Sequence, residues 1–114
     1  MKLHGHWRPV RAELDGQAAP DLALERMEFH LTSEGYAVHF SGEIYDRGTF
    51  THTETTILLT ANHGTNAGRV ITAIYQLAGD RLRICYGLDG SAPTEFKTAP
   101  GSARYLVTYR RHTG

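Results

Sequence analysis

Apolar and polar residues alternate along much of the chain. In residues 27–31 every second residue is apolar, and the same alternation returns in residues 36–40 after a Ser-Glu-Gly sequence at 33–35. A period of two places alternate side chains on opposite faces of a strand, with the apolar set towards a core. Two such runs joined by a short glycine-containing turn are typical of a β-hairpin.

Further runs of this kind predict eight strands. Pro9 interrupts the first strand and predicts a bend or bulge, because proline donates no backbone hydrogen bond. Gly48 predicts a bulge in the fourth strand, where alternation fails and the interior face stays undefined. Residues 62–68 and 88–101 are expected to be loops. The predicted strands cover residues 3–14, 27–31, 36–40, 43–52, 55–61, 69–78, 81–86 and 103–111.

Helix signals are confined to residues 21–27, directly after Pro20, where Asp21 is the expected cap. This helix would have two turns at most. Short strands separated by frequent turn signals are typical of a sandwich or barrel. We therefore expect an all-β fold with a single domain over residues 1–114, a small eight-stranded antiparallel barrel with one short helix. An eight-stranded barrel either is filled by its side chains or holds one small ligand.

Composition narrows the class of protein. The 12 basic and 12 acidic side chains give no net charge, which argues against a nucleic-acid partner because such proteins carry excess Lys and Arg. No apolar run approaches the roughly 20 residues of a membrane helix, so no membrane partner is expected. Cys85 is the single cysteine, and residues 1–7 lack the apolar core of a signal peptide. These features predict a cytoplasmic protein in a reducing compartment.

Several motifs occur in an order that we recognise. Residues 3–7 read Leu-His-Gly-His-Trp, and residues 74–85 read Ile-Tyr-Gln-Leu-Ala-Gly-Asp-Arg-Leu-Arg-Ile-Cys. Pro-Thr-Glu-Phe follows at 93–96 and Pro-Gly-Ser at 100–102. Together these motifs resemble an uncharacterised family of bacterial lipocalin-like domains, and the resemblance covers nearly the whole chain.

The resemblance implies a lipocalin-like barrel and no particular function. It implies that Trp7, in the Gly-x-Trp motif, packs across the barrel floor against a basic residue of the last strand, Arg110 or Arg111. A cation over an aromatic face contributes about 1 kcal/mol. Residues 50–56 depart from the family pattern, which usually has an Asp-Pro and a basic, proline-containing stretch there. A different middle hairpin indicates a different ligand or an acquired activity.

The aromatic residues are the main candidates for a ligand site. All six tyrosines fall on predicted strands, and tyrosine combines an apolar body with one hydroxyl that can orient a ligand. Tyrosine also favours strands for packing reasons alone, so a purely structural role remains an alternative. The predicted ligand-binding residues are Trp7, Phe29, Tyr36, Phe40, Tyr75 and Tyr86.

Other polar residues have weaker signals. Glu95, beside Pro93 and Phe96, and Tyr75 are the candidate catalytic groups, since a carboxyl held against aromatic rings acquires a raised pKa. Glu95 could equally cap its loop. His4 and His6 share a strand face, but no third ligand has matching spacing, so neither a metal site nor a cofactor is expected. His30 and His39 are expected to face outwards, and Cys85 to be structural.

Three functions are consistent with these features. The first is binding of a small hydrophobic or aromatic molecule in the barrel. The second is an isomerase or cyclase of a natural-product pathway that folds its substrate there, as other lipocalin-like barrels do. The third is a filled barrel that acts as a protein-interaction domain. Fold alone does not choose among them, and the sequence specifies neither the ligand nor the oligomeric state.

Overall fold

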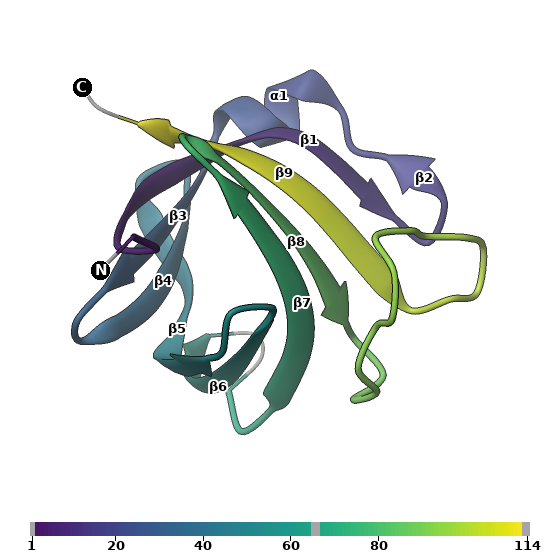
Figure 1. Ribbon diagram of the computed structural model, residues 1–114. Helices are drawn as coiled ribbons and strands as arrows, with labels where there is room; N and C mark the ends of the chain where they lie inside the picture. The colour runs from purple at the N-terminus through teal and green to yellow at the C-terminus, as the bar shows by residue number, and fades with distance from the viewer. Residues whose placement is uncertain (1, 65–66, 113–114) are drawn as a thin grey trace.

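The computed structural model describes residues 2–64 and 67–112, and it confirms the expected all-β fold (Figure 1). Eight antiparallel strands form a closed barrel with one short helix. In chain order the elements are β1 (Gly5–Leu14), β2 (Gln17–Ala18), α1 (Asp21–Glu25), β3 (Met27–Thr32), β4 (Gly35–Phe40), β5 (Glu43–His52), β6 (Thr56–Gly64), β7 (Val70–Ala78), β8 (Arg81–Gly87) and β9 (Arg104–His112).

The barrel closes between its first and last long strands. Each strand from β3 to β8 pairs with the next one in the chain, β1 pairs with β3, and β9 pairs with β1. The β1–β9 register runs from His6 opposite His112 to Leu14 opposite Tyr105. Closure satisfies the strand edges that an open sheet would leave exposed.

Register shifts occur near both positions where irregularities were expected. The β1–β9 register shifts between Pro9 and Arg11, where proline cannot contribute to the hydrogen-bond ladder. The β5–β6 register shifts beside Gly48, but the extra residue there is Asn62 of β6; the extra residue of β5 is Tyr45, in its pairing with β4. A Cβ atom at Gly48 would lie 1.9 Å from the carbonyl oxygen of Thr60, so glycine is required for the two strands to approach this closely.

Other details of the prediction were wrong. The helix ends at Glu25, and its N-cap is Pro20, with no side-chain cap from Asp21. Strand β6 continues to Gly64 instead of ending at residue 61, and residues 65–66 of the expected loop lie outside the described part of the chain. The two-residue strand β2 was not expected, because it is too short to show any periodicity.

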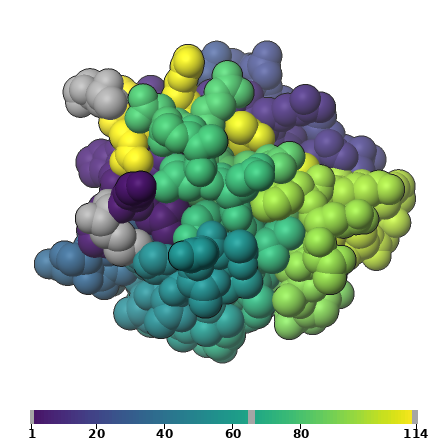
Figure 2. All heavy atoms as spheres, viewed as in Figure 1, coloured from purple at the N-terminus to yellow at the C-terminus, as the bar shows by residue number. Residues whose placement is uncertain are grey.

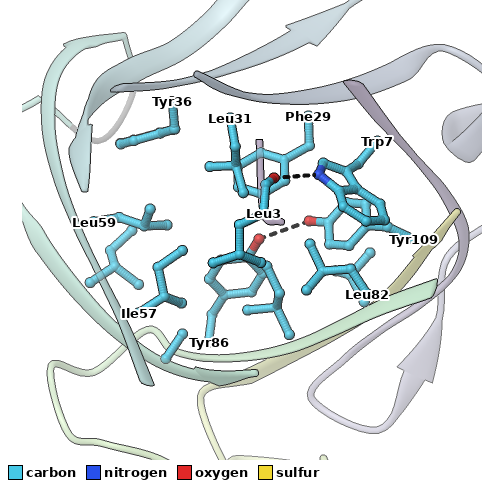
Figure 3. Packing of buried hydrophobic residues seen from close by; sticks show 14 of the residues in the cluster. Leu3, Trp7, Phe29, Leu31, Tyr36, Ile57, Leu59, Leu82, Tyr86 and Tyr109 are labelled. Carbon is cyan, nitrogen blue, oxygen red and sulfur yellow. Dashed lines mark hydrogen bonds between the residues drawn. The ribbon is translucent and has the colours of Figure 1, made fainter. Parts of the chain in front are cut away.

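A dense apolar cluster fills one end of the barrel, which we call the closed end. It includes Trp7, Leu31, Ile57 and Leu82, all at most 1% exposed, with Leu3 packed across them. Figure 3 shows these side chains pointing into the ring of strands, and the indole nitrogen of Trp7 donating a hydrogen bond to the carbonyl of Leu3. The segment before β1 thus closes this end.

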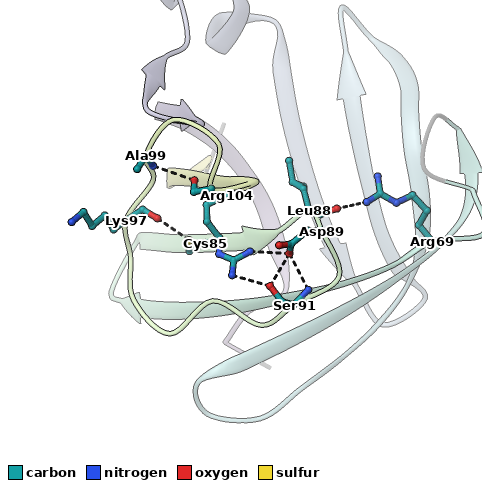
Figure 4. Close-up of polar contacts among 9 residues, drawn as sticks. Arg69, Cys85, Leu88, Asp89, Ser91, Lys97, Ala99 and Arg104 are labelled. Atoms are coloured by element: carbon teal, nitrogen blue, oxygen red, sulfur yellow. Dashed lines mark hydrogen bonds and ion pairs between the residues drawn. The ribbon is translucent and has the colours of Figure 1, made fainter.

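The long connection between β8 and β9 covers the outside of the barrel. Its Phe96 ring lies 4.1 Å from the guanidinium carbon of Arg83, and its Lys97 carbonyl accepts a hydrogen bond from the Cys85 thiol. Figure 4 shows Arg104 and Ser91 contacting the Asp89 carboxylate, which fixes the start of the loop. In Figure 2 the loop, in yellow-green, forms one flank of the molecule. Within the described residues, no helix is long and apolar enough to cross a membrane.

Candidate functional site

The other end of the barrel contains a cavity of about 730 Å³. Its walls come from the ends of the strands furthest from Leu3 and Trp7, including the start of β3 and the end of β8. Leu14, Phe40 and Tyr45 line it although each is substantially exposed, so the cavity opens to solvent at this end. We call these three residues the rim. A volume of this size lies within the range of small-molecule sites.

Aromatic side chains form much of the cavity wall. Phe29 stacks on Tyr109 with 5.2 Å between ring centroids, and Tyr86 stacks on Tyr105 at 5.6 Å. The hydroxyls of Tyr86 and Tyr109 lie 2.8 Å apart and hydrogen-bond each other (Figure 3). Since these two hydroxyls satisfy one another, the rings present mainly apolar surface to the cavity.

Burial keeps these hydroxyls protonated. It raises the pKa of Tyr86, of Tyr105 and of Tyr109, because an ionised phenolate would lose its solvation inside the barrel. The Tyr86–Tyr109 pair is therefore a neutral hydrogen bond over the ordinary pH range.

One polar group stands inside the aromatic wall. Asp46 is 5% exposed and lines the cavity, and the hydroxyl of Tyr36 donates a hydrogen bond to its Oδ1 at 3.4 Å. Burial raises the pKa of Tyr36, and the neighbouring Asp46 charge raises it further. The Tyr36 hydroxyl is therefore a stable donor beside a buried carboxylate.

A positive charge lies at the mouth of the cavity. Arg69 lines it, and its guanidinium donates a hydrogen bond to the carbonyl of Leu88 (Figure 4). This bond ties the residue before β7 to the residue after β8. The cavity thus has an apolar wall, a carboxylate–tyrosine pair inside and an arginine at its opening.

Four of the six predicted ligand-binding residues line this cavity: Phe29, Tyr36, Phe40 and Tyr86. Their part in binding stays a prediction. Trp7 lies at the closed end instead, where the guanidinium carbon of Arg111 is 4.3 Å from its ring centre. This contact confirms the expected pairing of Trp7 with a basic residue of the last strand, and it makes Trp7 a floor residue.

The structure does not place Tyr75 in the cavity. Its ring lies at the closed end, beyond Leu3, in a separate surface depression with His52 and Glu54, and its hydroxyl donates a hydrogen bond to the carbonyl of Thr53. The parity of Tyr75 along β7 was expected to direct it into a cavity, but the closed end is filled at that height. Tyr75 is therefore not part of the open-end site.

Glu95 is also outside the cavity. It is exposed on the β8–β9 loop, and that loop packs on the outer face of β8 through Phe96 and Lys97. The expectation of a carboxyl buried against aromatic rings therefore fails for Glu95. Asp46 is the carboxylate that has such surroundings.

Sequence reasoning missed several cavity residues, chiefly Asp46, Arg69, Tyr105 and Tyr109. The two tyrosines had a usable signal, since both share parity with the buried Val107 on β9. Asp46 had none, because the bulge at Tyr45 and the inward-facing Gly48 conceal the alternation there.

Comparison of the chain with family models, with curated proteins and with solved structures finds no match. The resemblance to lipocalin-like domains accordingly stays a prediction. The geometry of the cavity is therefore the basis for a proposed function.

Proposed function

We propose that this protein binds a small apolar or aromatic molecule in the open-end cavity. The observation that carries this proposal is a solvent-accessible cavity of about 730 Å³ with stacked aromatic rings as its wall. Apolar walls supply affinity through burial of ligand surface. The Asp46–Tyr36 pair supplies orientation, and it favours a ligand with one hydrogen-bond donor beside its apolar body.

The cavity favours binding over a filled barrel. A filled barrel requires side chains to occupy the axis along its whole length, whereas here a cavity of about 730 Å³ lies beside the core cluster of Leu3, Trp7 and Leu82. At the other end the apolar rim residues Phe40 and Tyr45 remain exposed around the opening. An apolar ligand entering there would bury the rim as well as the wall.

The test uses N-phenyl-1-naphthylamine, an uncharged aromatic dye whose fluorescence rises in apolar surroundings. Leu59 lines the cavity, whereas its neighbour Leu58 on β6 is 37% exposed and faces outwards. The variant Leu59→Trp fills the cavity and Leu58→Trp is its matched control. We expect saturable dye binding in the wild type and the control, and at least a tenfold loss of affinity in Leu59→Trp, about 1.4 kcal/mol.

Equal dye binding by both tryptophan variants would contradict the proposal, because the dye would then be on the outer surface. So would the absence of saturable binding in the wild type. Melting curves of both variants verify that each is folded. Native mass spectrometry of the protein from host lysate then seeks the natural ligand as an added mass that disappears on denaturation.

A second function, catalysis, is favoured by the Tyr36–Asp46 pair. A carboxylate next to a protonated hydroxyl in an apolar cavity combines a proton acceptor with a proton donor, as an isomerase or cyclase requires. Whether the protein is an enzyme or only binds its ligand, we expect the affinity of Asp46→Asn for the dye to stay within about threefold of the wild-type affinity. The natural ligand is then incubated with each protein and recovered. If the wild type changes it chemically and Asp46→Asn does not, the protein is an enzyme. If the ligand is recovered unchanged from both proteins, the protein only binds it.

A further inference from the structure

Histidine and glutamate side chains gather on the outer face of the barrel, on β1, β3 and β4. Trp7 and Phe29 point inwards, so their neighbours His6, Glu28 and His30 point outwards on β1 and β3. The register places His6 opposite His30, and Glu28 opposite His39 of β4. Residues distant in sequence thus share one surface patch, which we call the histidine cluster: His6, Glu28, His30 and His39.

The rings in this cluster are in direct contact. The His6 and His30 rings stack with 3.9 Å between centroids and 6° between planes, and the His39 ring lies 4.4 Å from that of His30 on a tilted plane. Nε2 of His30 is 3.3 Å from Oε1 of Glu28. Three imidazoles and one carboxylate therefore occupy a single small area.

The spacing of donor atoms fits a metal ion. One ligand atom from each of His6, Glu28 and His30 lies within 4.8 Å of the others. Zinc bonds of about 2.0–2.1 Å in a tetrahedron place ligand atoms about 3.3 Å apart, and the observed distance between His30 and Glu28 equals this value. His6 is exposed, so its ring has room to rotate and bring its nitrogen closer.

His39 has an unused nitrogen beside this triad. Its Nδ1 is buried, and no described residue gives it a hydrogen bond. A buried nitrogen without a partner is costly, and rotation of the ring would turn it into a ligand. The pKa of Glu28 is lowered chiefly by its hydrogen bond with His30 and to a smaller extent by the charge of Arg8. Arg8 is thus a nearby positive charge, and a cation bound here has to overcome its repulsion.

We propose that the histidine cluster binds one divalent transition-metal ion of the zinc class, with His6, Glu28 and His30 as ligands and His39 as the fourth. Nitrogen and carboxylate donors in this number suit zinc. The proposal replaces the expectation of no metal site. That expectation considered the spacing of His4 and His6 within one strand, whereas the further ligands come from β3 and β4. It does not depend on the proposed function, because none of the three histidines is among the residues that line the cavity, although Glu28 also borders it.

Calorimetric titration of the untagged chain with zinc chloride tests the proposal. We expect one equivalent of zinc to bind to the wild type. His30→Ala and Glu28→Gln should each weaken zinc binding about 100-fold, because each variant removes one of the four ligands. His63→Ala is the matched control, because His63 is an exposed histidine on β6, on another part of the barrel. We expect this control to bind zinc as the wild type does.

Cobalt provides a readout of the ligand geometry. Co²⁺ added to the wild type should give the intense visible absorption of a tetrahedral site, and zinc should displace it. His6→Ala, which alters only an exposed side chain, should lose this absorption and keep its melting temperature in EDTA. This variant keeps the test decisive if His30→Ala fails to fold. Zinc affinity equal in the wild type, His6→Ala and Glu28→Gln, or no stoichiometric binding at all, would overturn the proposal.

Discussion

The guanidinium of Arg111 lies over the ring of Trp7 at 4.3 Å and also donates hydrogen bonds to the carbonyls of Lys2 and His4. One side chain of the last strand therefore fixes both the floor aromatic residue and the segment that closes the barrel. Gly5 makes room for it, since a Cβ atom there would lie 2.6 Å from Nη1 of Arg111. This contact explains the Gly-x-Trp spacing in physical terms.

Removal of this guanidinium should destabilise the fold. We expect Arg111→Ala to lower the free energy of unfolding by about 2–4 kcal/mol, because it removes charged hydrogen bonds and a cation–π contact together. Arg110→Ala, at the exposed neighbouring position, should change it by less than about 0.5 kcal/mol. Urea unfolding followed by fluorescence of Trp7, the single tryptophan, measures both. Equal effects of the two variants would contradict this role of Arg111.

The hydroxyl pair of Tyr86 and Tyr109 should show strong coupling. Tyr86→Phe or Tyr109→Phe alone leaves one buried hydroxyl without its partner and should cost about 1–2 kcal/mol of unfolding free energy. The double variant removes both hydroxyls and should cost clearly less than the sum of the two. A double-mutant cycle in urea provides the measurement, and additive losses would show that the two hydroxyls do not depend on each other.

The same pair should limit stability in alkali. The pKa values of Tyr86 and Tyr109 are raised by burial, so the folded protein keeps both protons after the unfolded chain, with a tyrosine pKa near 10, begins to lose them. Their contribution is complete below about pH 10 and declines above it, by up to about 1.4 kcal/mol per pH unit for each tyrosine.

Unfolding free energies measured between pH 8 and pH 11 test this dependence. The double phenylalanine variant lacks both titrating groups and should show a shallower decline than the wild type. Identical slopes for the two proteins would indicate that the phenols ionise without unfolding.

The β8–β9 loop should control access to Cys85. The thiol is fully buried, and burial raises its pKa, so it should react slowly with iodoacetamide. Phe96→Ala removes the contact with Arg83 that holds the loop, and we expect labelling to be about five- to tenfold faster, since loop opening becomes easier. Thr94→Ala, an exposed position on the same loop, should leave the rate unchanged. Equal rates for all three proteins would exclude the loop as the barrier.

Much of the barrel was predictable because its strands alternate clearly. Residues 27–31 and 36–40 show period two, so their pairing and the inward faces of Phe29 and Tyr36 follow directly. Periodicity, however, specifies a face and not a height along the barrel axis. Tyr75 had the correct parity but lies at the filled end, and no pattern along β7 indicates that Leu3 closes that end.

The polar part of the site was hidden for a different reason. In β5 the inward positions are Asp46, Gly48 and Phe50, so an acid and a glycine stand where a core pattern requires apolar residues. The alternation disappears at the place where the strand contributes its buried carboxylate. Glu95 was chosen instead because it adjoins an aromatic residue in sequence, and the path of a long loop over the outer face of β8 is not encoded locally.

The pairing of β9 with β1 has a consequence for how the chain folds. Arg111 and the His4 carbonyl that accepts its hydrogen bond are 107 positions apart, so the contact that completes the barrel is among the most non-local in the chain. Proteins rich in such contacts fold slowly. Until β9 arrives, β1 and β8 each expose an unpaired edge that can recruit another chain. During synthesis, aggregation is therefore the hazard of this topology, and it ends when the last strand is inserted.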